Sequence, residues 1–254
     1  KDEHGIWRMD YQDMEEKIIR HKIHATIVCS PHNPCGRVWE RDEIERAMDI
    51  YHQHDCVVIS DEIWSDIILP GHKHIPTQSV SEDARMRTVA LYAPSKTFNL
   101  AGLVGSDHII YNETLRDRVC AVSNKTHYNE MNVLSMHALI GAYQPQGYEW
   151  LDELNEVIEG NIDYFCDYVD EHFEGVSYSR PQGTYMVFLD CTEWCREHGR
   201  DIQWLLDEGA RVGVGYQDGR PFHGPCHIRV NLALPLSRVR EACDRLDRYV
   251  FNAQ

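Results

Sequence analysis

The stretch YAPSKTFNLAG, residues 92–102, decides how this sequence is interpreted. Lys96 follows an apolar run and stands between two small hydroxyl residues, Ser95 and Thr97. A lysine usually lies on the solvated surface, because burying its charge without a partner is costly. A lysine at the end of a buried strand is therefore a candidate for a reactive amine.

Short apolar runs rich in β-branched residues alternate with a helical segment in the first half of the chain. The runs are residues 23–30, 56–60, 88–93 and 107–111. Between the first two, residues 41–54 carry apolar side chains at the spacing of one helix face. Continuous apolar strands separated by helices are typical of a parallel sheet covered on both faces. We therefore predict an α/β fold with a mostly parallel sheet.

The second half of the chain has a different pattern. Residues 130–172 are helical in spacing almost throughout and carry one apolar stripe, made of Leu151, Leu154, Ile158, Ile162, Phe165 and Val169. Apolar and turn-rich segments then alternate with helical ones, the last helix being expected at 237–250. This mixture predicts a smaller C-terminal α+β domain. We place the boundary near residue 150, giving a large domain at 1–150 and a small domain at 151–254.

Composition limits the partners. The formal net charge is -16, from 41 acidic and 25 basic residues, which disfavours nucleic acid and anionic membranes as partners. No apolar run approaches the roughly 18 residues that span a bilayer.

Nine cysteines without a CxxC pair predict reduced thiols in a cytoplasmic protein. The histidines show no metal-ligand pattern, so we predict no metal site and expect His72 and His74 to be solvated.

Three reactive side chains follow three successive strands. Asn33 lies in a turn after the first run, Asp61 ends the second, and Lys96 follows the third. Each alone has an ordinary explanation, as a turn residue, a helix cap or a surface lysine. Ligands of parallel sheets, however, bind outside the carboxyl ends of the strands. An amide, a carboxylate and an amine at one such edge suit pyridoxal 5'-phosphate, which condenses with a lysine and needs a carboxylate at its ring nitrogen.

These motifs resemble those of a known family. HNPCG, DEIW and SKTFNLAG are similar to motifs of fold-type I pyridoxal-phosphate-dependent enzymes, the aspartate aminotransferase superfamily. The longer stretches SPHNPCGRVW, DEIWSDII, APSKTFNLAGL and HIRVNLALP resemble the MalY/PatB-type cystathionine β-lyases. The resemblance runs from about residue 11 to the C-terminus. It implies the fold-type I transferase fold, with a partial large domain, and pyridoxal 5'-phosphate as cofactor. It also implies a small amino-acid substrate and a homodimer.

The resemblance implies a role for each matching residue. Lys96 would bind the cofactor covalently and move the proton of the substrate Cα. Asp61 would pair with the pyridinium nitrogen, Asn33 would hydrogen-bond the phenolic oxygen, and Ser95 would contact the phosphate. Arg229 would hold the substrate carboxylate in a bidentate contact, for which a guanidinium is well shaped.

Three departures from the family pattern accompany the resemblance. Trp64 stands three residues after Asp61, where aminotransferases usually carry tyrosine; an indole in this cofactor-binding position can stack or donate one N–H but cannot act as a phenolate. Val104 stands where many relatives have a phosphate-binding arginine, so the phosphate charge must be neutralised elsewhere. Family members are also typically much longer at the N-terminus. We expect either a fragment or a shortened homologue that lacks the N-terminal segment.

The expected function is C–S lysis, an α,β-elimination from cystathionine or a related cysteine conjugate that gives a thiol, pyruvate and ammonia. The first alternative is a pyridoxal-phosphate-dependent aminotransferase, in which the proton returns to the cofactor. The second is a catalytically silent, truncated domain.

Overall fold

The computed structural model describes residues 1–126 and 130–252. Contacts divide this chain into two compact units. The β1–β4 unit comprises Arg8–Pro31 and Val38–Glu153. The β5–β8 unit comprises Lys1–Trp7, His32–Arg37 and the chain from Leu154 onward. The division into domains at 1–150 and 151–254 stays a prediction.

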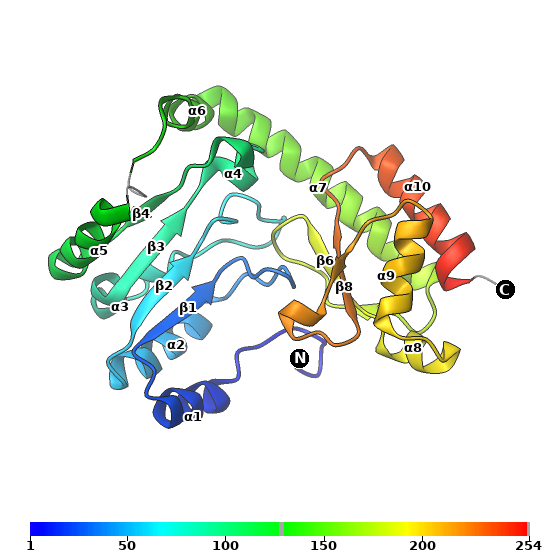
Figure 1. Cartoon of the computed structure of the whole chain (residues 1–254), viewed down its shortest axis with the longest axis horizontal. Helices are drawn as coiled ribbons and strands as arrows, with labels where there is room; N and C mark the ends of the chain where they lie inside the picture. Colours follow the sequence, from blue (N-terminus) through cyan, green and yellow to red (C-terminus); the bar gives the residue numbers. More distant parts are fainter. Residues whose placement is uncertain (127–129, 253–254) are drawn as a thin grey trace. The chain divides into compact units, whose positions relative to one another are not determined.

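The sheet of the first unit has the strand order β1-β2-β3-β4 (Figure 1). Strands β1 (Ala25–Cys29), β2 (Val57–Asp61) and β3 (Thr88–Tyr92) are parallel, and β4 (Asp107–Ile109) is antiparallel to β3. The predicted α/β fold with a mostly parallel sheet is confirmed. The register pairs Asp61 with Cys29 on one side and with Leu91 on the other. The carboxyl ends of β1, β2 and β3 therefore meet at one edge, where ligands of such sheets bind.

Two helices cover one face of this sheet. Helix α2 (Arg41–Gln53) begins with a capping box made by Glu40 and Glu43. Its predicted apolar face is buried and forms one core with α1 (Tyr11–His21) and the sheet; the α2 and sheet members of that core include Ile44, Ala47, Met48, Tyr51, Val28 and Val58. Each large apolar side chain buried in this way contributes about 1.5–3 kcal/mol. The unit also contains α3 (Glu82–Arg87), α4 (Pro94–Thr97), α5 (Glu113–Thr126) and α6 (Val133–Ala142).

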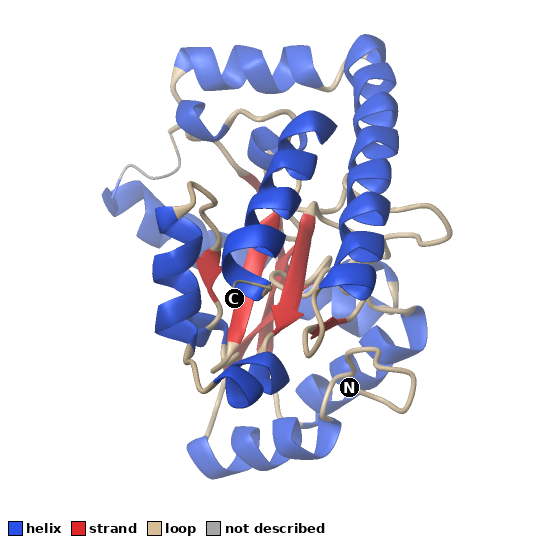
Figure 2. Ribbon diagram, turned by 90° about the vertical axis from the view of Figure 1, so that its right-hand side faces the viewer, coloured by secondary structure: helices blue, strands red, loops and turns tan. Residues whose placement is uncertain are grey.

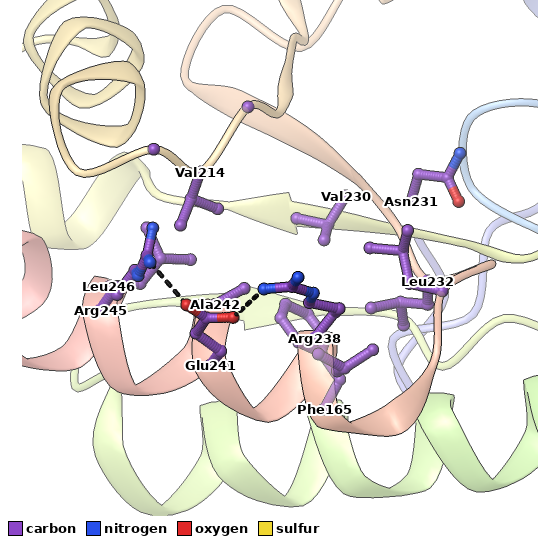
Figure 3. A pocket seen from close by; sticks show the side chains of 14 residues that line it. Phe165, Val214, Val230, Asn231, Leu232, Arg238, Glu241, Ala242, Arg245 and Leu246 are labelled. Atoms are coloured by element: carbon purple, nitrogen blue, oxygen red, sulfur yellow. Dashed lines mark hydrogen bonds and ion pairs between the residues drawn. The ribbon is translucent and has the colours of Figure 1, made fainter.

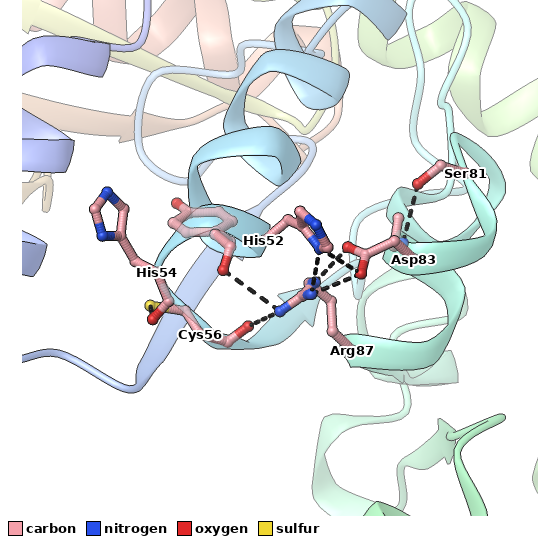
Figure 4. A network of polar contacts seen from close by, with 8 residues as sticks. His52, His54, Cys56, Ser81, Asp83 and Arg87 are labelled. Atoms are coloured by element: carbon pink, nitrogen blue, oxygen red, sulfur yellow. Dashed lines mark hydrogen bonds and ion pairs between the residues drawn. The ribbon is translucent and has the colours of Figure 1, made fainter.

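A polar cluster around Arg87 ties α3 to the end of α2 and the start of β2 (Figure 4). The Arg87 guanidinium donates to the carbonyl oxygens of Cys56 at 2.9 Å and Tyr51 at 3.4 Å. It also pairs with the Asp83 carboxylate, and this pairing lowers the pKa of Asp83. His52 Nδ1 lies 2.8 Å from Asp83 Oδ1 and 2.9 Å from an Arg87 nitrogen. These contacts satisfy the Tyr51 carbonyl near the end of α2 and the Cys56 carbonyl just before β2, at the end of the sheet opposite the carboxyl edge.

The long helix α7 (Pro145–His172) carries the apolar stripe predicted from the sequence. Leu151, Ile158, Ile162, Phe165 and Val169 are buried and Leu154 is half-buried. The pattern predicted one helical region over 130–172, whereas the structure has two helices, because α6 ends at Ala142 and α7 starts at Pro145. A proline is well placed at a helix start, because it lacks the N–H that would have no helical partner there.

The second sheet is antiparallel, with the order β5-β6-β8-β7. Its strands are β5 (Ser177–Tyr178), β6 (Met186–Asp190), β7 (Gln217–Asp218) and β8 (His227–Asn231). The same unit contains α8 (Thr192–His198), α9 (Ile202–Arg211), α10 (Leu236–Leu246) and a π-helical turn at Asp247–Phe251. Figure 2 draws the strands of the chain in red and its helices in blue. The buried amide of Asn161 donates to the carbonyl oxygens of Leu232 and Leu234, which fixes the chain after β8 against α7.

The sequence analysis also addressed membrane-spanning segments and the state of the cysteines. Among the described residues, no helix has the length and apolarity needed to cross a membrane. All nine cysteines are free thiols in the described chain.

Candidate functional site

Lys96 lies on a single helical turn that directly follows β3. Ala93 is extended, Pro94 occupies the first helical position, and α4 ends at Thr97. A proline in the first turn is favourable because its fixed φ suits the helix and its missing N–H costs nothing there. The turn closes through a hydrogen bond from the Phe98 N–H to the Pro94 carbonyl oxygen at 2.9 Å. The strand-to-turn transition therefore places Lys96 at the carboxyl edge of the sheet.

The amine of Lys96 faces an indole. Its Nζ lies 5.5 Å from the ring centroid of Trp64, within the range of a cation–π contact, and Trp64 is only 4% exposed. Lys96 itself is half-buried. Within the described residues, its ammonium has no ion-pair or hydrogen-bond partner. An unpaired amine beside an aromatic ring is unlike a lysine of a surface salt bridge.

Two more residues predicted for the site lie in the same unit. Asp61 is the last residue of β2, and its backbone carbonyl accepts a hydrogen bond from Ser30 at 3.0 Å. Its carboxylate accepts a hydrogen bond from the Ile63 N–H at 3.3 Å. Ser95 is half-buried in α4, next to Lys96, and its carbonyl accepts from Leu100. The structure thus places the carboxylate on the strand that neighbours β3.

The sequence analysis missed Glu62, whose side chain is 0% exposed. Its oxygens accept hydrogen bonds from His74 at 2.8 Å, Tyr92 at 2.7 Å, Ser60 at 2.8 Å and the Thr77 N–H at 3.0 Å. Burial alone would raise the pKa of Glu62, but the bonds from His74, Tyr92 and Ser60 hold that pKa below its usual value. The expectation that His74 is solvated was wrong, because this histidine packs against Glu62. The sequence feature that could have pointed to Glu62 is its place as a second carboxylate within the run ISDEIW.

Asn33 and Arg229 meet within the β5–β8 unit, although 196 positions separate them. Arg229 lies in the middle of β8, between Phe188 of β6 and Gln217 of β7. Its guanidinium donates a hydrogen bond to Asn33 Oδ1 and lies 4.8 Å from the ring centroid of Phe222. Burial lowers the pKa of Arg229, and the negative charge of an ionised Tyr185 would oppose that change. The guanidinium stays charged at any physiological pH.

The loop that carries Asn33 is anchored through Gly36. Gly36 has a φ of +69°, and a Cβ there would lie 2.8 Å from the Gly183 carbonyl oxygen and 2.4 Å from the Pro181 Cβ. The Gly36 carbonyl accepts hydrogen bonds from Gln182 and Gly183 at 2.8 and 3.0 Å. Arg37, which is 3% exposed, adds a bond to the Gln182 side chain. Only glycine allows this close approach, so the sequence NPCG has a structural reason for its glycine.

A separate cavity of 360 Å³ lies in the β5–β8 unit between α7, α10 and the strand β8 (Figure 3). Arg238 and Arg245 at its rim both pair with Glu241, at 2.7 and 2.5 Å. None of the six residues predicted for the site lines this cavity. It is therefore distinct from the groups described above.

Known proteins resemble this chain over nearly its whole length. Residues 2–246 match the family described as aminotransferase class I and II. The chain is 31% identical to cystathionine beta-lyase PatB of Bacillus subtilis over 245 residues, which are 95% of this chain and 62% of that protein. It is 32% identical to the protein MalY of Escherichia coli over 238 residues, which are 92% of this chain and 59% of MalY.

Solved structures of related proteins also match this chain. The crystal structure of cystalysin from Treponema denticola, which contains pyridoxal 5'-phosphate, matches with a TM-score of 0.90 and 32% identity. The match covers 97% of this chain and 62% of cystalysin, so the chain spans about three fifths of the length of these relatives. These matches confirm the predicted fold-type I transferase fold and the resemblance to the PatB and MalY lyases. The chain belongs to the class I and II aminotransferase family.

Proposed function

We propose that this chain belongs to a pyridoxal-phosphate-dependent C–S lyase that cleaves cystathionine or a related cysteine conjugate. The observation that carries the proposal is the unpaired Lys96 amine beside Trp64, on the turn after β3, with Asp61 at the end of the neighbouring strand β2. The names of PatB and of the other lyases among the relatives support the reaction class.

The side chains of Lys96, Asp61, Trp64 and Ser95, all in the β1–β4 unit, suit pyridoxal 5'-phosphate. Lys96 would hold it covalently, and the Asp61 carboxylate would keep a proton on its ring nitrogen. Trp64 and Ser95 would contact the ring and the phosphate, and the Asn33 amide would donate to the phenolic oxygen. When bound, the cofactor supplies a sink for the negative charge that develops on the substrate Cα.

The remaining chemistry is assigned to the chain's own residues. Arg229 holds the substrate carboxylate with two N–H groups and so orients the Cα–H bond. Lys96 takes the proton from Cα, and the thiolate leaves from Cβ with the electron pair of the C–S bond. With water, the three-carbon remainder becomes pyruvate and ammonia, while the thiolate gains a proton and leaves as homocysteine when cystathionine is the substrate.

An aminotransferase is the second candidate, because the family includes that reaction. Trp64 favours the lyase, since an indole cannot provide the phenol that aminotransferases of the superfamily usually place three residues after the aspartate. A third candidate is a catalytically silent domain. We further propose a homodimer in the cytoplasm, with residues 1–150 as the cofactor-binding domain and 151–254 as the small domain.

Product analysis separates these candidates. The 254-residue chain is supplied with pyridoxal 5'-phosphate and cystathionine, with and without a 2-oxo acid. A lyase releases pyruvate and a thiol in both reactions. An aminotransferase consumes cystathionine only with the 2-oxo acid and forms the matching amino acid. If neither product forms although the cofactor binds Lys96, the chain is silent.

A further inference from the structure

The helical turn that carries Lys96 cannot hold its own shape. Helix α4 contains only four residues, Pro94–Thr97, and an isolated turn of this length is unstable in water. The Lys96 ammonium itself forms no hydrogen bond or ion pair with any described residue. Apart from its contact with the Trp64 ring, the position of the amine therefore depends on the residues that hold the turn.

The residue after Lys96, Thr97, is bonded to a carboxylate. Thr97 is 0% exposed, and its hydroxyl donates to Asp66 Oδ2 at 2.8 Å. The hydroxyl of Tyr143 donates to the same oxygen at 3.0 Å. Burial and the negative charge of Asp66 raise the pKa of Tyr143, so its hydroxyl keeps the proton that it donates. Asp66 is half-buried, and hydrogen bonds to a carboxylate are stronger than bonds between neutral groups.

Asp66 belongs to the same loop as the indole that faces Lys96. Trp64 and Asp66 are two residues apart, and they contact Lys96 and Thr97, which are adjacent. The loop after β2 therefore touches the turn after β3 at two consecutive residues. Phe98 adds an edge-to-face contact with Tyr143, with the ring centroids 5.0 Å apart.

We propose that Asp66 is a positioning residue for Lys96: its carboxylate, bonded to Thr97 and Tyr143, fixes the α4 turn so that the amine stays over Trp64. The proposal rests on the proposed function in giving Lys96 its chemical role. Asp66 does not touch the amine in this scheme; it acts through Thr97.

The first experiment reports the position of the amine without any cofactor. Lysines of the 254-residue chain are dimethylated with ¹³C-formaldehyde, which keeps their charge, and the Lys96 signal is assigned by its loss in Lys96→Arg. In the wild-type chain, the ring current of Trp64 displaces this signal from that of the exposed Lys125. In Thr97→Val and Asp66→Asn the displacement falls to less than about half, whereas Thr97→Ser retains it.

Thr192→Val is the matched control, because the Thr192 hydroxyl also donates to a carboxylate, that of Asp190 at 2.6 Å, but in the other unit. This variant keeps the displaced signal. A Lys96 signal that coincides with that of Lys125 in the wild-type chain would overturn the proposal. So would a displacement that survives in both Thr97→Val and Asp66→Asn.

The second experiment connects position with reactivity. Unmethylated chains are incubated with pyridoxal 5'-phosphate, reduced with borohydride and mapped by mass spectrometry. We expect Thr97→Val to lower the rate of adduct formation at Lys96 by about tenfold, equivalent to about 1.4 kcal/mol, with the rate at Lys125 unchanged. An unchanged rate at Lys96 refutes the positioning role. If the NMR result holds but the wild-type chain forms no adduct at Lys96, the proposed function fails instead.

Discussion

The guanidinium of Arg229 donates a hydrogen bond to the side-chain oxygen of Asn33. This bond fixes the orientation of the Asn33 amide, because the oxygen is occupied and the NH₂ group remains free to donate. According to the family resemblance, this NH₂ group of Asn33 would donate a hydrogen bond to the phenolic oxygen of the cofactor. Arg229 would then have two roles, holding the substrate carboxylate and orienting the amide of Asn33.

Replacing Arg229 with Ala should lower kcat/KM for cystathionine by the equivalent of about 2–4 kcal/mol, the usual cost of losing a buried bidentate charge contact. Arg229→Lys keeps the charge but loses the planar fork, so it should recover only part of the loss. Arg220→Ala is the control, because Arg220 pairs with Asp218 at the surface. Steady-state kinetics that leave Arg229→Ala equal to this control would remove Arg229 from the site.

Replacing Gly36 with Ala should destabilise the loop that carries Asn33. The new Cβ meets the Gly183 carbonyl oxygen and Pro181, in addition to the cost of a positive φ. We expect a loss of about 2 kcal/mol or more in the free energy of unfolding, measured by urea denaturation. Gly199→Ala provides the comparison, since Gly199 has a φ of +61° but no atom within 4 Å of the added Cβ. If both variants lost the same free energy of unfolding, the close contact of Gly36 with Pro181 and Gly183 would not contribute to stability.

The thiol of Cys35 should resist alkylation. Burial raises the pKa of Cys35 to about 11, so about one thiol in a thousand is ionised at pH 8. Cys120 is exposed on α5. With iodoacetamide at pH 8, mass spectrometry should find Cys120 modified while Cys35 remains intact. Modification of both cysteines at one rate would mean that the loop opens freely.

His32, whose Nδ1 lies 3.2 Å from the Cys35 sulfur, should titrate below pH 6.5. Burial lowers the pKa of this imidazole, because it disfavours the charged form. The unfolded chain therefore binds a proton at a higher pH than the folded chain, and stability falls as the pH drops below about 6.5. NMR titration of the His32 ring gives the midpoint. A midpoint at or above 6.5 would contradict the prediction, as would an unfolding free energy whose loss between pH 7 and 5.5 is the same in His32→Gln.

Periodicity made much of the fold predictable. The apolar faces of α2 and α7 follow directly from residue spacing. The end of β2 at Asp61, and the end of β3 just before the turn that carries Lys96, follow from where each apolar run stops. Periodicity does not give strand direction, so β4 could not be identified as antiparallel. Helix α5 was not predicted from the sequence, and none of its described side chains is fully buried.

Side-chain networks were less predictable than strand ends. Glu62 and Asp66 stand in the same quoted motif, but their partners His74, Tyr92 and Tyr143 lie far along the chain. Only the folded chain brings such donors to one carboxylate. The placement of Asn33 has the same cause: the sequence assigned it to the end of β1, whereas Gly36 anchors its loop to residues 181–183.

The most direct test of the central claim is to identify the lysine that binds the cofactor. The wild-type chain is incubated with pyridoxal 5'-phosphate, reduced with borohydride and digested, and the modified peptides are quantified beside those of Lys96→Ala. The account predicts that the peptide containing Lys96 carries most of the adduct, and that Lys96→Ala leaves only slow modification of exposed lysines such as Lys125. An adduct spread evenly over the lysines, or an equal total yield from Lys96→Ala, would contradict it.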